Sequence, residues 1–146
     1  MDRREMLLGS AAMLAAAATG QVFAAEHEHE HHHPAMAANQ VLINATSDCI
    51  QKGQACLNHC FTLLGQGEKE MATCAASVNQ MLAMCAALQQ LASANSKYLA
   101  AQAKVVMEVC KDCQEECKKH ASKHEECKLC GEACAVCYKE CQKVAA

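Results

Sequence analysis

Apolar residues recur at spacings of three and four from Met36 onward, which is the repeat of one face of an α-helix. The repeat stops at three short stretches rich in glycine, serine, asparagine and other polar residues, where turns are favoured. No segment alternates with a period of two, so strands are not expected. The pattern predicts helices over residues 36–64, 68–92 and 97–120, and a fourth that follows Ser122 and ends near Val144.

Short links between long helices favour an antiparallel bundle. Gly65-Gln66-Gly67 ends the first helix, and Ser122 with Glu125 has the spacing of a capping box before the fourth. Helices of roughly 20–29 residues are roughly 30–40 Å long. The chain is also rich in good helix formers and has only two Phe, two Tyr and no Trp. We therefore expect an all-α, up-down-up-down antiparallel four-helix bundle.

The N-terminal residues resemble an export signal rather than part of the bundle. The pair Arg3-Arg4 precedes a mildly hydrophobic, alanine-rich run over 6–18, and small residues offer a cleavage site near Ala24 or Ala25. Residues 1–25 are thus similar to a twin-arginine signal, with an ordinary secretory signal as the alternative. We expect a periplasmic or other extracytoplasmic protein that is exported after folding in the cytoplasm.

A histidine-rich tail follows the signal. Residues 26–33 alternate glutamate and histidine, contain five histidines and lead into Pro34. The segment has no apolar side chain to bury, so residues 26–35 are predicted to be disordered. The histidines could capture metal weakly or could simply be solvated. The folded domain is expected to cover residues 36–146.

Cysteine occupies positions where a bundle core normally carries leucine. The chain has 13 cysteines, and on the last predicted helix five of them follow one another at spacings of 3, 4, 3 and 4. This spacing places all five on one core-facing stripe. The other predicted helices carry their cysteines on equivalent stripes. The 13 candidate ligands are Cys49, Cys56, Cys60, Cys74, Cys85, Cys110, Cys113, Cys117, Cys127, Cys130, Cys134, Cys137 and Cys141.

Packing and disulfides account poorly for these stripes. A buried thiol packs as a small hydrophobe, but leucine would bury more area at five successive core positions. Disulfides suit an exported chain. However, cysteines three or four residues apart on a helix have Cβ atoms about 5–6 Å apart, whereas a disulfide needs about 3.8 Å. An odd number of cysteines also leaves one unpaired, although a disulfide-stapled structural protein remains an alternative.

A polynuclear metal site explains the stripes better, and charge favours Cu(I). Soft thiolates select Cu(I), Zn(II) or iron–sulfur clusters. One Cu(I) per thiolate leaves the core neutral, whereas a zinc ion with four thiolates carries a net charge of −2 inside it. Ferredoxin cysteines use a different spacing, usually on loops. If each thiolate bridges two metals, the chain would hold about 13 Cu(I) ions. Zinc or cadmium sequestration is the alternative, and no catalytic triad or open metal position indicates an enzyme.

The motif Cys127-Lys-Leu-Cys130-Gly-Glu-Ala-Cys134-Ala-Val-Cys137-Tyr-Lys-Glu-Cys141 resembles the last helix of the cysteine-rich copper storage proteins. The resemblance covers about residues 36–146, and the match to exported members from methane-oxidising bacteria is close. It implies a four-helix bundle, a homotetramer and many Cu(I) ions bound by cysteine. It also implies that the stored copper serves a copper-dependent oxidase such as the particulate methane monooxygenase. Three stripe positions carry another residue where a further thiol could fit, namely Gly53, Val78 and Met81.

The cysteines are predicted to gather toward one end of the bundle. In an antiparallel arrangement, Cys60, Cys74, Cys117 and Cys127 share this end, which we call the thiol end. His59 and Met71 lie at the same end and are candidate entry ligands, whereas His120 and His124 are interpreted as solvated helix-end residues. Met81 and Met84 are interpreted as core filler. The opposite, apolar end is expected to contain Leu42, Leu88, Leu91, Leu99 and Val106.

Charge indicates how the outside of the bundle is used. The net charge of −3 gives no reason to expect a nucleic-acid partner. Residues 71–96 contain no charged residue at all. Asn79, Gln80, Gln89 and Gln90 interrupt this segment, which disfavours a membrane span. Because charge depletion is typical of interface cores, the segment predicts contact between subunits.

Overall fold

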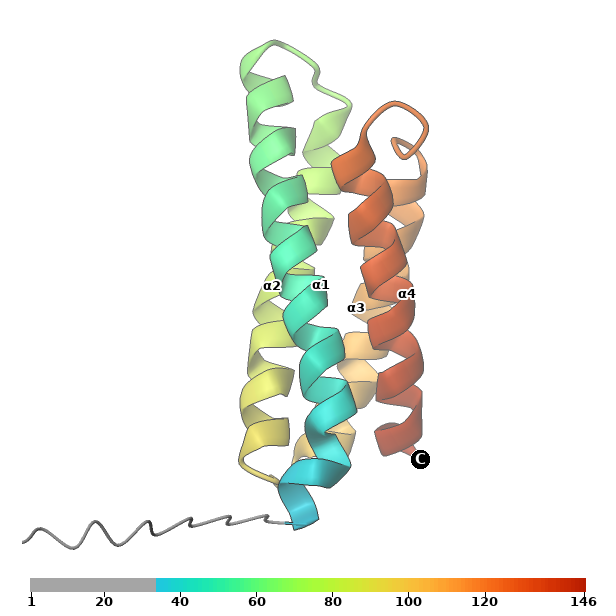
Figure 1. The fold of residues 1–146 in the computed structure, drawn as a ribbon. Coiled ribbons are helices and arrows are strands. Elements are labelled where there is room, and N and C mark those ends of the chain that lie inside the picture. Colours follow the sequence, from blue (N-terminus) through green and yellow to red (C-terminus); the bar gives the residue numbers. More distant parts are fainter. Residues whose placement is uncertain (1–33) are drawn as a thin grey trace, which may run out of the picture. The chain divides into compact units, whose positions relative to one another are not determined.

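Four antiparallel helices build the bundle in the computed structural model, which describes residues 34–146 (Figure 1). Each helix packs against the ones before and after it, and the first also packs against the last. The backbones of the two diagonal pairs of described helices stay apart, so the four surround one central core in which their side chains meet. The predicted fold is confirmed. The helices are α1 (Pro34–Gly65), α2 (Met71–Ser93), α3 (Leu99–Lys118) and α4 (Glu125–Ala145).

The helix boundaries differ from the predicted ones by a few residues. The first helix starts at Pro34, which suits a first turn because proline lacks only an N–H that would be unpaired there. The predicted tail therefore overlaps α1 at residues 34–35, while the rest of the tail and the signal lie outside the described residues. The second helix starts at Met71 rather than at residue 68. Residues 68–70 instead form a turn, in which the Met71 N–H donates to the Glu68 carbonyl over 3.2 Å.

The predicted capping box before α4 is wrong. The N-cap residue is His124, its backbone is extended, and its side chain makes no capping hydrogen bond. Ser122 belongs to a turn in which the N–H groups of Lys123 and His124 both donate to the His120 carbonyl over 3.0 Å. Two glutamates in the first turn of α4 instead suit the positive end of the helix dipole.

The core has a thiol region and an apolar end, as predicted. All 13 cysteines have no exposed surface. At the opposite end of the bundle, the buried residues are aliphatic, and Asn39 closes this end by donating its side-chain amide to the Ala92 carbonyl over 3.2 Å. The aliphatic side chains at this end are Leu42, Leu88, Ala92, Leu99, Ala103 and Val106, with Leu91 partly buried against them.

Two stripe positions of α1 carry neither cysteine nor a large apolar residue. Thr46 is fully buried, and its hydroxyl lies 2.8 Å from the Ile43 carbonyl, so its polar group is satisfied within the helix. Gly53 faces Met81, and a Cβ added to it would lie 2.5 Å from the Met81 methyl carbon. A further thiol at Gly53 would therefore require the flexible end of the Met81 side chain to move.

Among the described helices, α2 alone is long and apolar enough to span a membrane on length and composition. Its core stripe is nevertheless buried by its neighbours in the bundle, and includes Cys74, Val78 and Cys85. Its outward residues include Ala76 and Gln80, both exposed and uncharged. The helix thus combines a buried thiol stripe with an uncharged outer face.

Candidate metal centre

The thiols of the four helices converge on the bundle axis. Six interhelical pairs of Sγ atoms lie 3.7–4.0 Å apart. They arise because each core-facing stripe presents a thiol at matching heights along neighbouring or diagonal helices. The pairs are Cys49–Cys134, Cys56–Cys127, Cys74–Cys117, Cys85–Cys110, Cys85–Cys137 and Cys113–Cys130.

These contacts join into groups whose Sγ atoms all lie within 4.8 Å of one another. The groups share members, because Cys56 belongs to two of them, as does Cys130, while Cys134 of a third group lies 3.7 Å from Cys49 of the fourth. Every cysteine except Cys141 belongs to at least one group. We call this continuous series the thiol column; its groups are Cys56/Cys60/Cys74/Cys127, Cys56/Cys117/Cys130, Cys113/Cys130/Cys134 and Cys49/Cys85/Cys110/Cys137.

The sulfur spacing fits a metal with few ligands. With metal–sulfur bonds of about 2.3 Å, a trigonal ion separates its sulfurs by roughly 4.0 Å and a linear ion by roughly 4.6 Å. The interhelical pairs at 3.7–4.0 Å are already close to the trigonal value. All 13 cysteines lie in the described residues and are free thiols, and their separations are far above the disulfide bond length of about 2.0 Å.

Burial and mutual hydrogen bonding control the protonation of the thiols. Burial raises the pKa of Cys60 from 9.0 to about 12. A hydrogen bond with Cys137, together with burial, raises the pKa of Cys141. Hydrogen bonding with Cys110 and Cys134 has the opposite effect on Cys49 and lowers its pKa to about 6. A metal that enters the column must therefore displace protons from thiols such as Cys60.

The two predicted entry residues have different surroundings. Met71 is fully buried at the first turn of α2, one turn before Cys74. His59 is half-buried, and its Nε2 lies 2.9 Å from the Nδ1 of His124 and 3.7 Å from the Glu126 carboxylate. The thiol groups contain no histidine, so His59 lies beside the column rather than within it. The interpretation of His124 as a solvated residue is wrong, since it is half-buried against His59.

Sequence reasoning missed one sulfur in contact with the column. Met81 is fully buried, and its Sδ lies 3.4 Å from the Sγ of Cys49. The residue occupies a core-facing position of α2, one turn before Cys85. Only its place on the stripe could have indicated this contact, because methionine at such a position is usually filler.

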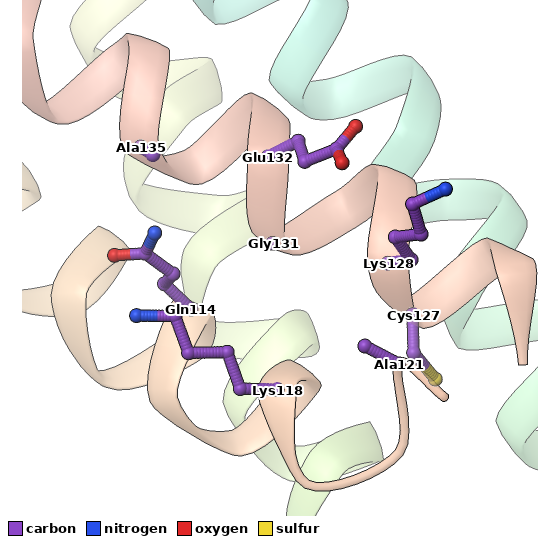
Figure 2. A pocket seen from close by; sticks show the side chains of 8 residues that line it. All are labelled: Gln114, Lys118, Ala121, Cys127, Lys128, Gly131, Glu132 and Ala135. Carbon is purple, nitrogen blue, oxygen red and sulfur yellow. The ribbon is translucent and has the colours of Figure 1, made fainter. Parts of the chain in front are cut away.

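A pocket of about 320 Å³ lies on the outside of the bundle between α3 and α4 (Figure 2). Gln114 and Lys118 line it from α3, and Lys128 and Gly131 line it from α4. Gly131 allows the two helices to approach, since a Cβ there would lie 3.3 Å from the Cys117 Cβ. Cys127 also lines the pocket, so one thiol of the column lies directly beneath this surface.

The fold and the column together define the class: a helical bundle with a polynuclear thiolate metal centre. The sequence pattern of the copper storage protein family matches residues 35–146, and the chain belongs to this family. Its members store a metal rather than catalyse a reaction. Among the curated proteins, none matches the chain.

Solved structures of the family are similar in fold. The Cu(I)-bound copper storage protein 3 of Bacillus subtilis is 24% identical, with a TM-score of 0.68 over 74% of this chain and 98% of that one. A copper storage protein of Streptomyces lividans, loaded with 10 copper equivalents, is 28% identical, with a TM-score of 0.66 over 77% of this chain and 84% of that one. A cytosolic copper storage protein of Streptomyces lividans with five coppers is 26% identical, with a TM-score of 0.68 over 77% of this chain and 95% of that one.

The raised thiol pKa values predict that the apo-protein loses stability at alkaline pH. Cys60 keeps its proton up to about pH 12 in the fold but loses it near 9.0 in the unfolded chain. Its contribution is therefore fully present below pH 9 and is lost as the pH rises toward 12, by up to about 1.4 kcal/mol per pH unit for each such thiol. Denaturant unfolding, followed by circular dichroism in steps of roughly one pH unit between pH 8 and 11, measures this loss of stability.

Copper-loaded protein is the control, because its thiols have already lost their protons. Its stability should change much less over the same pH range. Equal slopes for the apo and loaded proteins would contradict the assignment of the alkaline loss to the thiols.

Proposed function

We propose that the chain stores about 13 Cu(I) ions in the thiol column and at Cys141, which adjoins the column at Cys137, with each thiolate bridging two metals. The observation that carries this proposal is the sharing of thiols between groups, because Cys56 and Cys130 each belong to two groups. A shared thiol suits a bridging ligand, whereas separate sites would need separate thiols. One Cu(I) per thiolate also keeps the buried column neutral at every degree of filling.

Sequestration of zinc or cadmium is a second candidate, favoured by one specific observation. Two of the groups contain four thiols each, which is the ligand set of a tetrahedral structural zinc site. Charge argues against it, since each such site would add a net charge of −2 to the same core. We therefore favour Cu(I).

A Cu(I) titration tests the capacity. We expect saturation near 13 ions per chain, because bridging lets each of the 13 thiolates account for one metal. The thiolate absorption in the near ultraviolet and a parallel count of free thiols measure the filling. Saturation at about six ions, as expected for two terminal thiolates per metal, would contradict the bridged arrangement. A matched titration with Zn(II) distinguishes the second candidate, which predicts about two tight sites.

We also propose that copper enters at the thiol end. The opposite end has no thiol or thioether in its core, which is lined by aliphatic side chains such as Leu42 and Leu88 and closed by the Asn39 amide. A thioether at Met71 and an imidazole at His59 bind Cu(I) without the proton loss that a thiol requires. They are therefore suited to pass copper on to the nearby group that contains Cys60 and Cys74.

The entry route predicts a kinetic effect without a change in capacity. The double variant His59→Ala and Met71→Leu should load more slowly from a Cu(I) donor and release copper more slowly to a chelator. Its final copper content should remain that of the wild type, because every thiol remains. Stopped-flow transfer measures both rates. His120→Ala is the control, since this half-buried histidine lies at the same end. Unchanged rates in the double variant would place the entry elsewhere, for example at the pocket beside Cys127.

We propose that the protein assembles as a homotetramer through the uncharged face of α2. Exposed alanines and Gln80 form this face, and no charged residue interrupts it. The resemblance to exported copper storage proteins supports the same assembly. Export through residues 1–25 is proposed from the pair Arg3-Arg4 and the apolar run that follows it. Delivery of copper to an enzyme such as the particulate methane monooxygenase rests on the resemblance.

A single charge on this face tests the assembly. Gln80→Lys should shift the oligomer toward smaller species, because the lysine charge would have to lose its hydration at the interface. Gln89 would be a poorer choice for this test, since it is half-buried and bonded to Ser47 of α1. Analytical ultracentrifugation measures the change, with Lys111→Gln on the exposed face of α3 as the control. A monomeric wild type would contradict the proposal.

A further inference from the structure

Met81 places a thioether against the thiol column at about the middle of the bundle. Its Sδ lies 3.4 Å from the Sγ of Cys49, and both residues are fully buried. Cys49 belongs to a group of four thiols and also lies 3.7 Å from Cys134 of the next group. Besides the thiols of its own group, Cys49 therefore has a further thiol, Cys134, and a thioether, Met81, as sulfur neighbours.

The neighbouring helix leaves room for this arrangement. Gly53 occupies the stripe position of α1 between Cys49 and Cys56, and it has no side chain to fill the core there. The methyl group of Met81 fills this space, since a Cβ on Gly53 would lie 2.5 Å from it. With its methyl group over Gly53, the side chain places its sulfur beside Cys49.

We propose that Met81 is a copper ligand, supplying a third and neutral sulfur to a Cu(I) ion that Cys49 and Cys134 hold. This inference rests on the Cu(I) storage proposed above. A two-coordinate ion between Cys49 and Cys134 has an open side, and a thioether is a soft donor suited to it. The thioether carries no charge and has no proton to release, so its coordination leaves the charge of the site unchanged. The Met81 Sδ and the Cys49 Sγ lie 3.4 Å apart, so only a small movement would bring them to the roughly 4.0 Å that separates two sulfurs of a trigonal site.

The thioether of Met81 also influences which metal ion the site prefers. A thioether discriminates among metals, since it binds Cu(I) well but is a poor ligand for zinc. Met81 would therefore favour cuprous copper at the junction between the Cys49 group and the group that contains Cys134. A leucine would fill the same volume without providing a donor.

Selenium absorption spectroscopy tests the bond directly. The probe is full-length protein labelled with selenomethionine and carrying Met71→Leu, so that the candidate entry ligand does not contribute. After loading with Cu(I), the selenium spectrum should show a copper neighbour at bonding distance. This signal should vanish in the double variant Met71→Leu and Met81→Leu. It should persist when Met84→Leu replaces Met81→Leu, because the Met84 sulfur lies near the Gln102 amide instead of a thiol.

A competition experiment measures the contribution to binding. In Met81→Leu, one Cu(I) ion should be lost to a chelator at a concentration about tenfold lower than in the wild type, with total capacity unchanged. Met84→Leu should behave as the wild type. The selenium measurement on the Met71→Leu protein does not depend on whether Met81→Leu folds.

The outcomes separate this inference from the function on which it rests. Full loading with no copper neighbour of selenium would show that Met81 only packs against Cys49, and copper storage would stand. A protein that binds no Cu(I) would overturn both the storage function and the ligand role of Met81.

Discussion

The structure depends on keeping a buried core electrically neutral while it fills with ionisable groups. A thiolate without a counter-charge is very costly inside a protein, whereas a protonated thiol packs as a small hydrophobe. Thirteen cysteines can therefore share one core with leucine and valine as long as each sulfur carries a proton or a monovalent metal, or is stabilised by hydrogen bonds from other thiols, as Cys49 is. Exchange of a proton for Cu(I) changes what each sulfur binds without changing the net charge of the core. The same bundle can then be stable when empty, partly filled or full.

The geometry of the bundle converts this constraint into a metal site. Helices in a four-helix bundle approach closely when the core side chains are small, and cysteine is among the smallest residues that can line such a core. The resulting sulfur separations of 3.7–4.0 Å are too long for a disulfide and close to what a trigonal metal requires. Because groups share Cys56 and Cys130, neighbouring sites are joined into one column. The apolar end, with Leu88 and Val106, provides ordinary packing that needs no metal.

The two ends and the outer surface divide the remaining tasks. At the thiol end, His59 is hydrogen-bonded to His124 and lies close to Glu126, so this end of the bundle carries a polar cluster. Along α2 the inner face contributes Cys74 and Cys85, while the outer face is uncharged. The interruption of the α1 stripe at Gly53 is filled by a methionine from α2. At Thr46, the other interruption, the buried hydroxyl is satisfied by the Ile43 carbonyl of the same helix.

The amino-acid sequence by itself determined the helices, the bundle and the placement of the cysteines in its core. The reason is that a stripe at spacings of three and four is a local property of a helix, and five cysteines on one such stripe leave few alternatives. The boundaries were less certain: α2 begins at Met71 and the cap of α4 is His124, because turn hydrogen bonds at Glu68 and His120 compete with helix formation. Only the tertiary structure decided which thiols meet, that His124 packs on His59, and that Met81 contacts Cys49 through the space above Gly53. These contacts join residues far apart in the chain, and they depend on the relative heights and rotations of the helices, which no periodicity within one helix specifies.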